Sequence, residues 1–96
     1  MTSRVLVENP NHPGTSRAVD ATSYEAMRGV ILRVLPRRSP GMTYDEMSGA
    51  VKKLVPNEVF PAGARAGWWL KCVQLDLEAK GTITREKTRP LRWRRV

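Results

Sequence analysis

The chain has few of the side chains from which metal and nucleophile sites are usually built. Among its 96 residues are a single cysteine, Cys72, and a single histidine, His12. One cysteine excludes a disulfide within the chain, and one Cys with one His is too few for a zinc site in one chain. We therefore expect no bound metal, no cofactor and no thiol–histidine nucleophile.

Long apolar runs are also lacking. No stretch approaches the ~20 apolar residues of a membrane-spanning helix, and residues 1–14 contain no apolar run of signal-peptide length. A chain of 96 residues is long enough for one small domain and too short for a second core. We expect a cytoplasmic protein of one domain with no membrane partner.

Acidic residues are scarce relative to basic ones. The chain contains nine Asp and Glu residues and 17 Lys and Arg residues, so its formal net charge is +8. Such an excess indicates which partners a protein attracts and says nothing about its fold. It favours a nucleic-acid partner, although a generally basic soluble protein would show the same balance.

Carboxylate pairs suited to catalysis are missing as well. Asp45 and Glu46 fall in the first turn of an expected helix, where the helix dipole favours acids. Asp76 and Glu78 lie about 200° apart around a helix, so they cannot share a proton or a metal. No serine has a base partner placed by sequence, and we expect no enzymatic activity.

Residues 1–19 read as an N-terminal arm, and residues 20–96 as the domain. Val5, Leu6 and Val7 can form a short strand added to a sheet edge, but the arm can also be a mobile tail. The first helix is expected over residues 22–35, with Thr22 and Glu25 as a capping box or Asp20 as the cap instead. Its apolar face is formed by Tyr24, Met27, Ile31, Val34 and Leu35.

The second helix, expected over residues 44–54, has the best-marked start in the chain. Thr43 can cap it, Glu46 stands three residues later, and Met42 and Met47 occupy the positions of a hydrophobic staple. Pro56 follows its end.

The third helix is expected over residues 62–80 and has two apolar arcs. One arc consists of Ala66, Trp69, Leu70, Val73 and Leu77, and the other of Trp68, Cys72, Leu75 and Ala79. Both arcs should be buried, including Trp68 and an unreactive Cys72. Only a narrow polar strip then faces outward, formed by Gly67, Lys71, Gln74 and Glu78.

Gly81 is placed to end this helix in the left-handed conformation. A hairpin follows, in which Ile83 on one strand and Leu91 and Trp93 on the other alternate inward, while Arg92 and Arg94 point to the opposite face. The fold class expected is mostly α with a small antiparallel β-sheet, in the form of three helices and a C-terminal β-hairpin.

This order of elements is similar to that of winged helix-turn-helix domains. The run from Trp69 through Lys80-Gly81 to Trp93 looks like the recognition helix and wing of the N-terminal domains of Mrr-type restriction proteins. The chain as a whole resembles a family of small bacterial proteins of uncharacterised function. The motifs that carry this second resemblance are Asn9-Pro10-Asn11, Pro13-Gly14, Val19-Asp20-Ala21, Tyr24, Ala26-Met27, Pro40 to Thr43, Gly67-Trp68-Trp69 and Val73 to Gly81.

The winged-helix resemblance implies a small non-enzymatic protein that binds duplex DNA, mainly through phosphate contacts. Arg pairs well with phosphate because its planar guanidinium donates two parallel hydrogen bonds. The alternative is a winged-helix module for protein interaction or homodimerisation that binds no nucleic acid. The residues expected to bind nucleic acid are Arg65, Lys71 and Gln74 on the third helix and Arg85, Lys87, Arg89, Arg92, Arg94 and Arg95 on the hairpin. Arg37 and Arg38, just past the first helix, can either widen this basic patch or cap the end of the helix.

Overall fold

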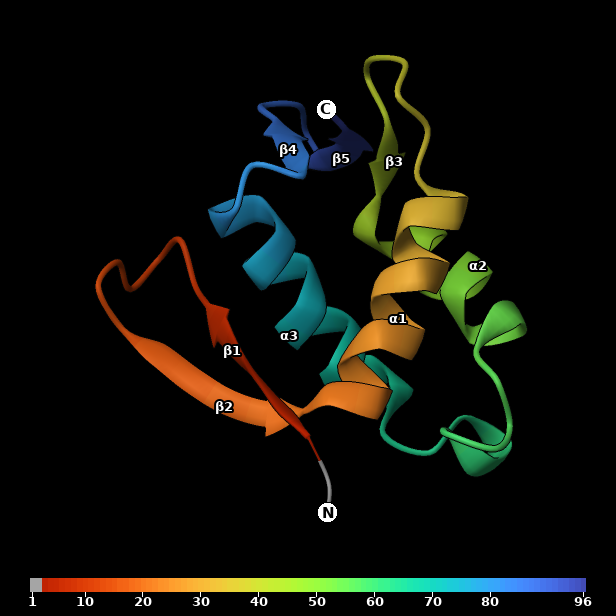
Figure 1. The fold of residues 1–96 in the computed structure, drawn as a ribbon. Coiled ribbons are helices and arrows are strands. Elements are labelled where there is room, and N and C mark those ends of the chain that lie inside the picture. Colours follow the sequence, from red (N-terminus) through yellow and green to blue (C-terminus); the bar gives the residue numbers. More distant parts are fainter. Residues whose placement is uncertain (1–2) are drawn as a thin grey trace.

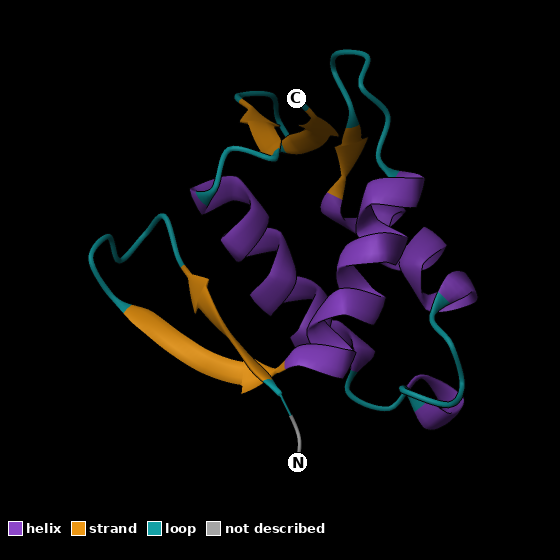
Figure 2. Cartoon of the chain, in the orientation of Figure 1, coloured by secondary structure: helices purple, strands orange, loops and turns teal. Residues whose placement is uncertain are grey.

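The computed structural model describes residues 3–96, in which three α-helices pack with two small antiparallel sheets (Figures 1 and 2). Residues 1 and 2 of the expected arm lie outside the described residues. The N-terminal sheet stands to one side of helix α3, while the C-terminal sheet lies across the far end of the helices (Figure 1).

The N-terminal arm forms a complete hairpin of two strands, β1 (Arg4–Glu8) and β2 (Ser16–Asp20). The sequence left the arm open between a short strand and a mobile tail, and β1 is that strand. Strand β2 was not predicted, because Ser16-Arg17-Ala18 is too polar to signal a strand. Val7 and Val19 are buried on the inner face of the hairpin, whereas Leu6 is 62% exposed on the outer face.

Helix α1 (Ala21–Val34) follows β2 without a loop. Its cap is Asp20, whose Oδ2 accepts a hydrogen bond from the Ser23 amide at 2.9 Å, so the alternative capping box at Thr22 is not used. Helix α2 (Tyr44–Leu54) has the predicted bounds and capping box: the Glu46 amide donates to Thr43 Oγ1, and the Thr43 amide donates to Glu46 Oε1.

Helix α3 (Ala66–Ala79) begins four residues later than predicted. A short 3₁₀ turn (Pro61–Gly63) precedes it, and Ala62 and Arg65 have positive φ angles of 54° and 62°, which interrupt a continuous helix. Its end is as expected: Gly81 has a φ of 76°, and the Thr82 amide donates to the carbonyl of Leu77.

The C-terminal sheet has three strands in the order β3-β5-β4, formed by β3 (Met42–Thr43), β4 (Ile83–Glu86) and β5 (Arg92–Arg95). Strand β3 was not predicted, because two residues carry no periodic signal. Ile83 and Trp93 are buried against the helices as expected. Leu91 is 39% exposed, contrary to the prediction, because it lies in the β4–β5 turn and not in a strand.

A single core joins these elements. Helix α1 buries Tyr24, Met27, Val30, Ile31 and the following Leu35, while the expected Val34 is only partly buried. The other buried apolar residues are Val7 and Val19 of the hairpin, Met47, Val51 and Phe60, Ala66, Trp69, Leu70, Val73 and Leu77 of α3, and Ile83 and Trp93 of the C-terminal sheet.

Gly41 and Gly81 both have positive φ, and comparing them tests how closely the chain at Gly41 approaches strand β5. A Cβ on Gly41 would lie 2.1 Å from the backbone oxygen of Trp93, whereas a Cβ on Gly81 would meet no heavy atom within 4 Å from the described residues beyond its chain neighbours. We expect Gly81→Ala to lower the free energy of unfolding by about 1 kcal/mol through backbone strain alone. Gly41→Ala should cost about 2 kcal/mol, because the backbone at Gly41 must also move away from Trp93 of β5. Urea unfolding of both variants measures the difference; equal losses would show that the backbone at Gly41 does not approach β5 this closely.

Candidate nucleic-acid interface

The face of the C-terminal sheet that points away from the helices carries alternate residues of β4 and β5. Ile83 and Trp93 point inward, so Glu86, Arg92 and Arg94 point outward. Arg94 Nε donates to Glu86 Oε1 at 2.8 Å. Arg92 Nη1 donates to the Gly41 carbonyl at 3.1 Å and lies 3.4 Å from Glu46 Oε1. Both arginines are therefore partly committed to contacts within the protein.

The pKa values of the two acids reflect these contacts. Hydrogen bonds from Arg94 and then Ser39 lower the pKa of Glu86. The hydrogen bond from the Thr43 backbone is the largest cause of the lowered pKa of Glu46, and the charge of Arg92 adds to it. Both carboxylates are ionised at neutral pH and offset part of the positive charge on this face.

The loop between α1 and β3 packs against the same sheet. The Arg95 amide donates to the Pro36 carbonyl at 2.9 Å, and Arg95 Nε donates to the Leu35 carbonyl at 2.8 Å. Arg95 thus fastens the loop to β5 rather than extending into solvent. The loop carries Arg37 and Arg38, both exposed, and Figure 1 shows it at the same end of the molecule as the β4–β5 turn.

The β4–β5 turn carries two more exposed basic residues, Lys87 and Arg89. Within residues 3–96, neither these two nor Arg37 and Arg38 form a salt bridge. We call these four side chains, together with Arg92 and Arg94, the basic sheet end. The sequence placed the turn and strand residues there, but Arg37 and Arg38 join them only because the loop folds back onto β5.

Arg85 does not belong to this surface. Its Nη2 donates to Glu78 Oε1 at 3.1 Å, and its guanidinium carbon lies 5.5 Å from the centre of the Trp93 ring. Glu78 also accepts a hydrogen bond from the Trp93 indole N–H at 2.6 Å. The charge of Arg85 is consequently matched by an acid beneath the sheet.

Gln74 was expected to face outward from α3, and this is wrong. Its side chain is fully buried and donates to Glu78, because the C-terminal sheet covers this side of the helix. Its Oε1 has no hydrogen-bond partner among the described residues. Gln74 therefore cannot reach a base edge in this structure.

Lys71 and Arg65 are exposed as expected, but they lie on the N-terminal half of α3 and its approach. Lys71 Nζ stands 4.9 Å from the centre of the Tyr44 ring, and the Arg65 guanidinium stands 5.3 Å from the centre of the Trp68 ring. Neither residue is among those that define the basic sheet end.

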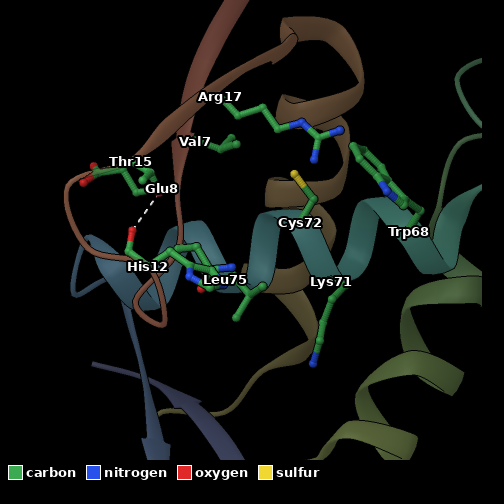
Figure 3. A pocket seen from close by; sticks show the side chains of 10 residues that line it. Val7, Glu8, His12, Thr15, Arg17, Trp68, Lys71, Cys72 and Leu75 are labelled. Carbon is green, nitrogen blue, oxygen red and sulfur yellow. Dashed lines mark hydrogen bonds between the residues drawn. The ribbon is translucent and has the colours of Figure 1, made fainter.

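The second apolar arc of α3 is not fully buried, contrary to the prediction. Trp68 is 39% exposed and Cys72 is half-buried. The N-terminal hairpin faces this arc but leaves a hollow of about 400 Å³, here called the hairpin pocket (Figure 3). Its lining residues are Val7, Glu8, Asn9, His12, Thr15, Arg17, Trp68, Lys71, Cys72 and Leu75.

A buried carboxylate, Asp76, fastens the hairpin to α3. Its Oδ1 accepts the Glu8 amide at 2.9 Å, and its Oδ2 accepts the Tyr24 hydroxyl and lies 2.9 Å from Lys80 Nζ. Burial, and then the hydrogen bond to Asp76, raise the pKa of Tyr24 well above its ordinary value. This role of Asp76 was not predicted from the sequence, although Asp76 and Lys80 have the i,i+4 spacing of an ion pair on a helix.

Cys72 provides a test of the environment of the pocket. Burial raises the pKa of its thiol, with the charge of Arg17 acting in the opposite direction. Because the thiolate is the reactive form, we expect the alkylation rate with iodoacetamide to keep rising above the pH at which an ordinary thiol levels off. The same protein in denaturant is the control. A rate that levels off at the same pH in both states would contradict this environment.

Within residues 3–96 no cluster of three or more His, Cys, Asp or Glu side chains could hold a metal ion. No helix of the described chain combines the length and apolar character needed to cross a membrane.

The model of a family described as "Family of unknown function (DUF6958)" matches residues 4–93. No curated protein and no solved structure matches the chain.

Proposed function

The chain belongs to the DUF6958 family, and we propose that it is a small non-enzymatic protein that binds duplex DNA through phosphate contacts at the basic sheet end. The observation that carries this proposal is a set of four exposed basic side chains that form no salt bridge within residues 3–96, namely Arg37, Arg38, Lys87 and Arg89.

The arrangement of elements supports a winged-helix assignment. Helix α1, strand β3, helices α2 and α3 and the pair β4–β5 follow one another in the order of a winged helix-turn-helix domain, and β3 completes a three-stranded sheet with the pair. On this assignment β4–β5 is the wing, and its turn bears Lys87 and Arg89.

The burial of Gln74 changes how such a protein would recognise DNA. The side of α3 that would read bases through Gln74 is covered by the sheet, and the opposite arc faces the hairpin. Of Lys71 and Gln74, the two α3 residues predicted to reach bases, only Lys71 is exposed. Binding dominated by phosphate contacts, with little discrimination among sequences, follows from this arrangement.

A binding titration tests the proposal. A fluorescently labelled duplex of random sequence is titrated with the protein at low salt, and anisotropy reports binding. Saturable binding that is competed equally by unrelated duplexes supports the proposal. An unchanged anisotropy at high protein concentration would contradict it.

One observation favours the alternative, a module for protein interaction or dimerisation. Strands β1 and β2 form a sheet of only two strands, so among the described residues each has an unpaired edge. The outer face of this hairpin exposes Leu6. Sedimentation velocity separates the two functions, since a dimer formed through this edge would persist at high salt, whereas binding through phosphates weakens steeply.

A further inference from the structure

We infer that the hairpin pocket is a binding site for a flat organic anion, with an apolar body and one carboxylate or sulfonate group. This inference goes beyond DNA binding, and its test uses no nucleic acid. Small-molecule sites are concave, mostly apolar and supplied with a few polar groups that fix orientation. The hairpin pocket has these properties on the side of α3 that faces the N-terminal hairpin (Figure 3).

The size and lining of the pocket suit the apolar body. Its volume of about 400 Å³ lies within the roughly 300–1,000 Å³ of known ligand pockets. Val7 of β1 supplies one wall, and Trp68, Cys72 and Leu75 follow one another along the arc of α3 that faces it. A planar ring placed between the hairpin and the helix would cover the exposed part of Trp68.

Arg17 supplies the anion-binding group. The register of the hairpin places it opposite Val7, on the inner face, and its side chain extends above Cys72 toward Trp68 (Figure 3). Its guanidinium carbon lies 5.3 Å from the centre of the Trp68 ring. Within residues 3–96 the side chain of Arg17 takes part in no salt bridge. A guanidinium beside an aromatic ring can still donate two parallel hydrogen bonds to a carboxylate.

The other charged residues of the lining leave Arg17 as the main charge inside the pocket. Glu8 alternates with Val7 along β1 and so shares the outer face with Leu6, and its backbone amide is bound to Asp76. Lys71 directs its ammonium group to the Tyr44 ring, on the side of α2. The pocket therefore favours a single negative charge placed close to Arg17.

The experiment uses 8-anilinonaphthalene-1-sulfonate, a flat aromatic anion, and the neutral N-phenyl-1-naphthylamine as probes. Fluorescence titration of the folded full chain gives both dissociation constants. The variant is Arg17→Gln, and the matched control is Arg4→Gln, which removes the same charge from an exposed position of the same hairpin. Alkylation of Cys72 in the presence of each probe reports whether the probe occupies the pocket.

We expect Arg17→Gln to weaken binding of the sulfonate by about tenfold, since a hydrogen-bonded charge pair is lost, and to leave binding of the neutral probe nearly unchanged. Arg4→Gln should leave both affinities unchanged, and the sulfonate should slow alkylation of Cys72 in the unsubstituted protein. Equal affinities for the sulfonate in both variants, or alkylation unaffected by saturating probe, would overturn the inference.

Discussion

Asp76→Ala is expected to lower the free energy of unfolding by about 3 kcal/mol, the largest effect of any single substitution considered. The carboxylate is fully buried and accepts hydrogen bonds from the Glu8 amide and the Tyr24 hydroxyl. Removing it leaves two donors without a partner, and each such donor costs roughly 1–3 kcal/mol when buried. Lys80 is 41% exposed in its side chain and can turn to solvent, so its loss adds little.

Chemical denaturation of the variant measures this loss, and Asp45→Ala is the matched control. Asp45 is also a helical aspartate but is exposed in the first turn of α2, so its removal should cost less than about 1 kcal/mol. Hydrogen exchange should show that the Glu8 amide loses protection in Asp76→Ala. If the two variants were equally stable, Asp76 would not be the fastening point between hairpin and helix.

The second large effect concerns DNA. Replacing Arg37, Arg38, Lys87 and Arg89 together with glutamine is expected to weaken binding to duplex DNA and to make the plot of log affinity against log salt shallower. Each phosphate contact contributes about 0.9 to the slope, so the loss can reach roughly 3–4 units. Stability should change little, because exposed side chains without partners are usually worth less than about 0.5 kcal/mol each.

Arg92 and Arg94 are not substituted in this variant. Arg92 contacts the Gly41 carbonyl and Glu46, and Arg94 pairs with Glu86, so their removal would disturb the sheet. The matched control carries the same change of charge elsewhere, as Arg4→Gln, Arg28→Gln, Lys52→Gln and Lys53→Gln. This control variant should keep most of the slope of log affinity against log salt that the unsubstituted protein shows. Equal slopes in the two quadruple variants would show that binding follows net charge and not the basic sheet end.

Local signals in the sequence predicted helix ends correctly where one or two neighbouring residues determine the end. Thr43 with Glu46 defines the start of α2, and Gly81 defines the end of α3. The cap of α1 was left open between two nearby candidates, because Asp20 and Thr22 both carry a suitable oxygen and only the backbone path selects one.

Periodicity was less reliable for α3, because it shows which residues share a face and not what covers that face. Gln74 looked exposed by its polarity, but the C-terminal sheet packs over it and Glu78 accepts its hydrogen bond. Trp68 was predicted to be buried because it lies on an apolar arc of the helix, but the hairpin leaves a hollow beside it. Both errors come from contacts with segments distant in sequence, which local patterns do not encode.

The sequence predicted the turn and strand residues of the basic sheet end but left Arg37 and Arg38 open between widening the patch and capping the first helix. The turn and strand residues are contiguous in the sequence, so their shared position follows once the hairpin is recognised. Arg37 and Arg38 stand about fifty residues away and join the surface through the bonds from Arg95 to Pro36 and Leu35. Pairing within the surface was also invisible in the sequence, since the partner of Arg92 is Glu46 on another element.

A salt titration of the unsubstituted protein on a random duplex tests the central claim most directly. If Arg37, Arg38, Lys87 and Arg89 each neutralise one phosphate, log affinity should fall with log salt with a slope of about −3 to −4. A slope near zero, or no binding at low salt, would contradict DNA binding through the basic sheet end.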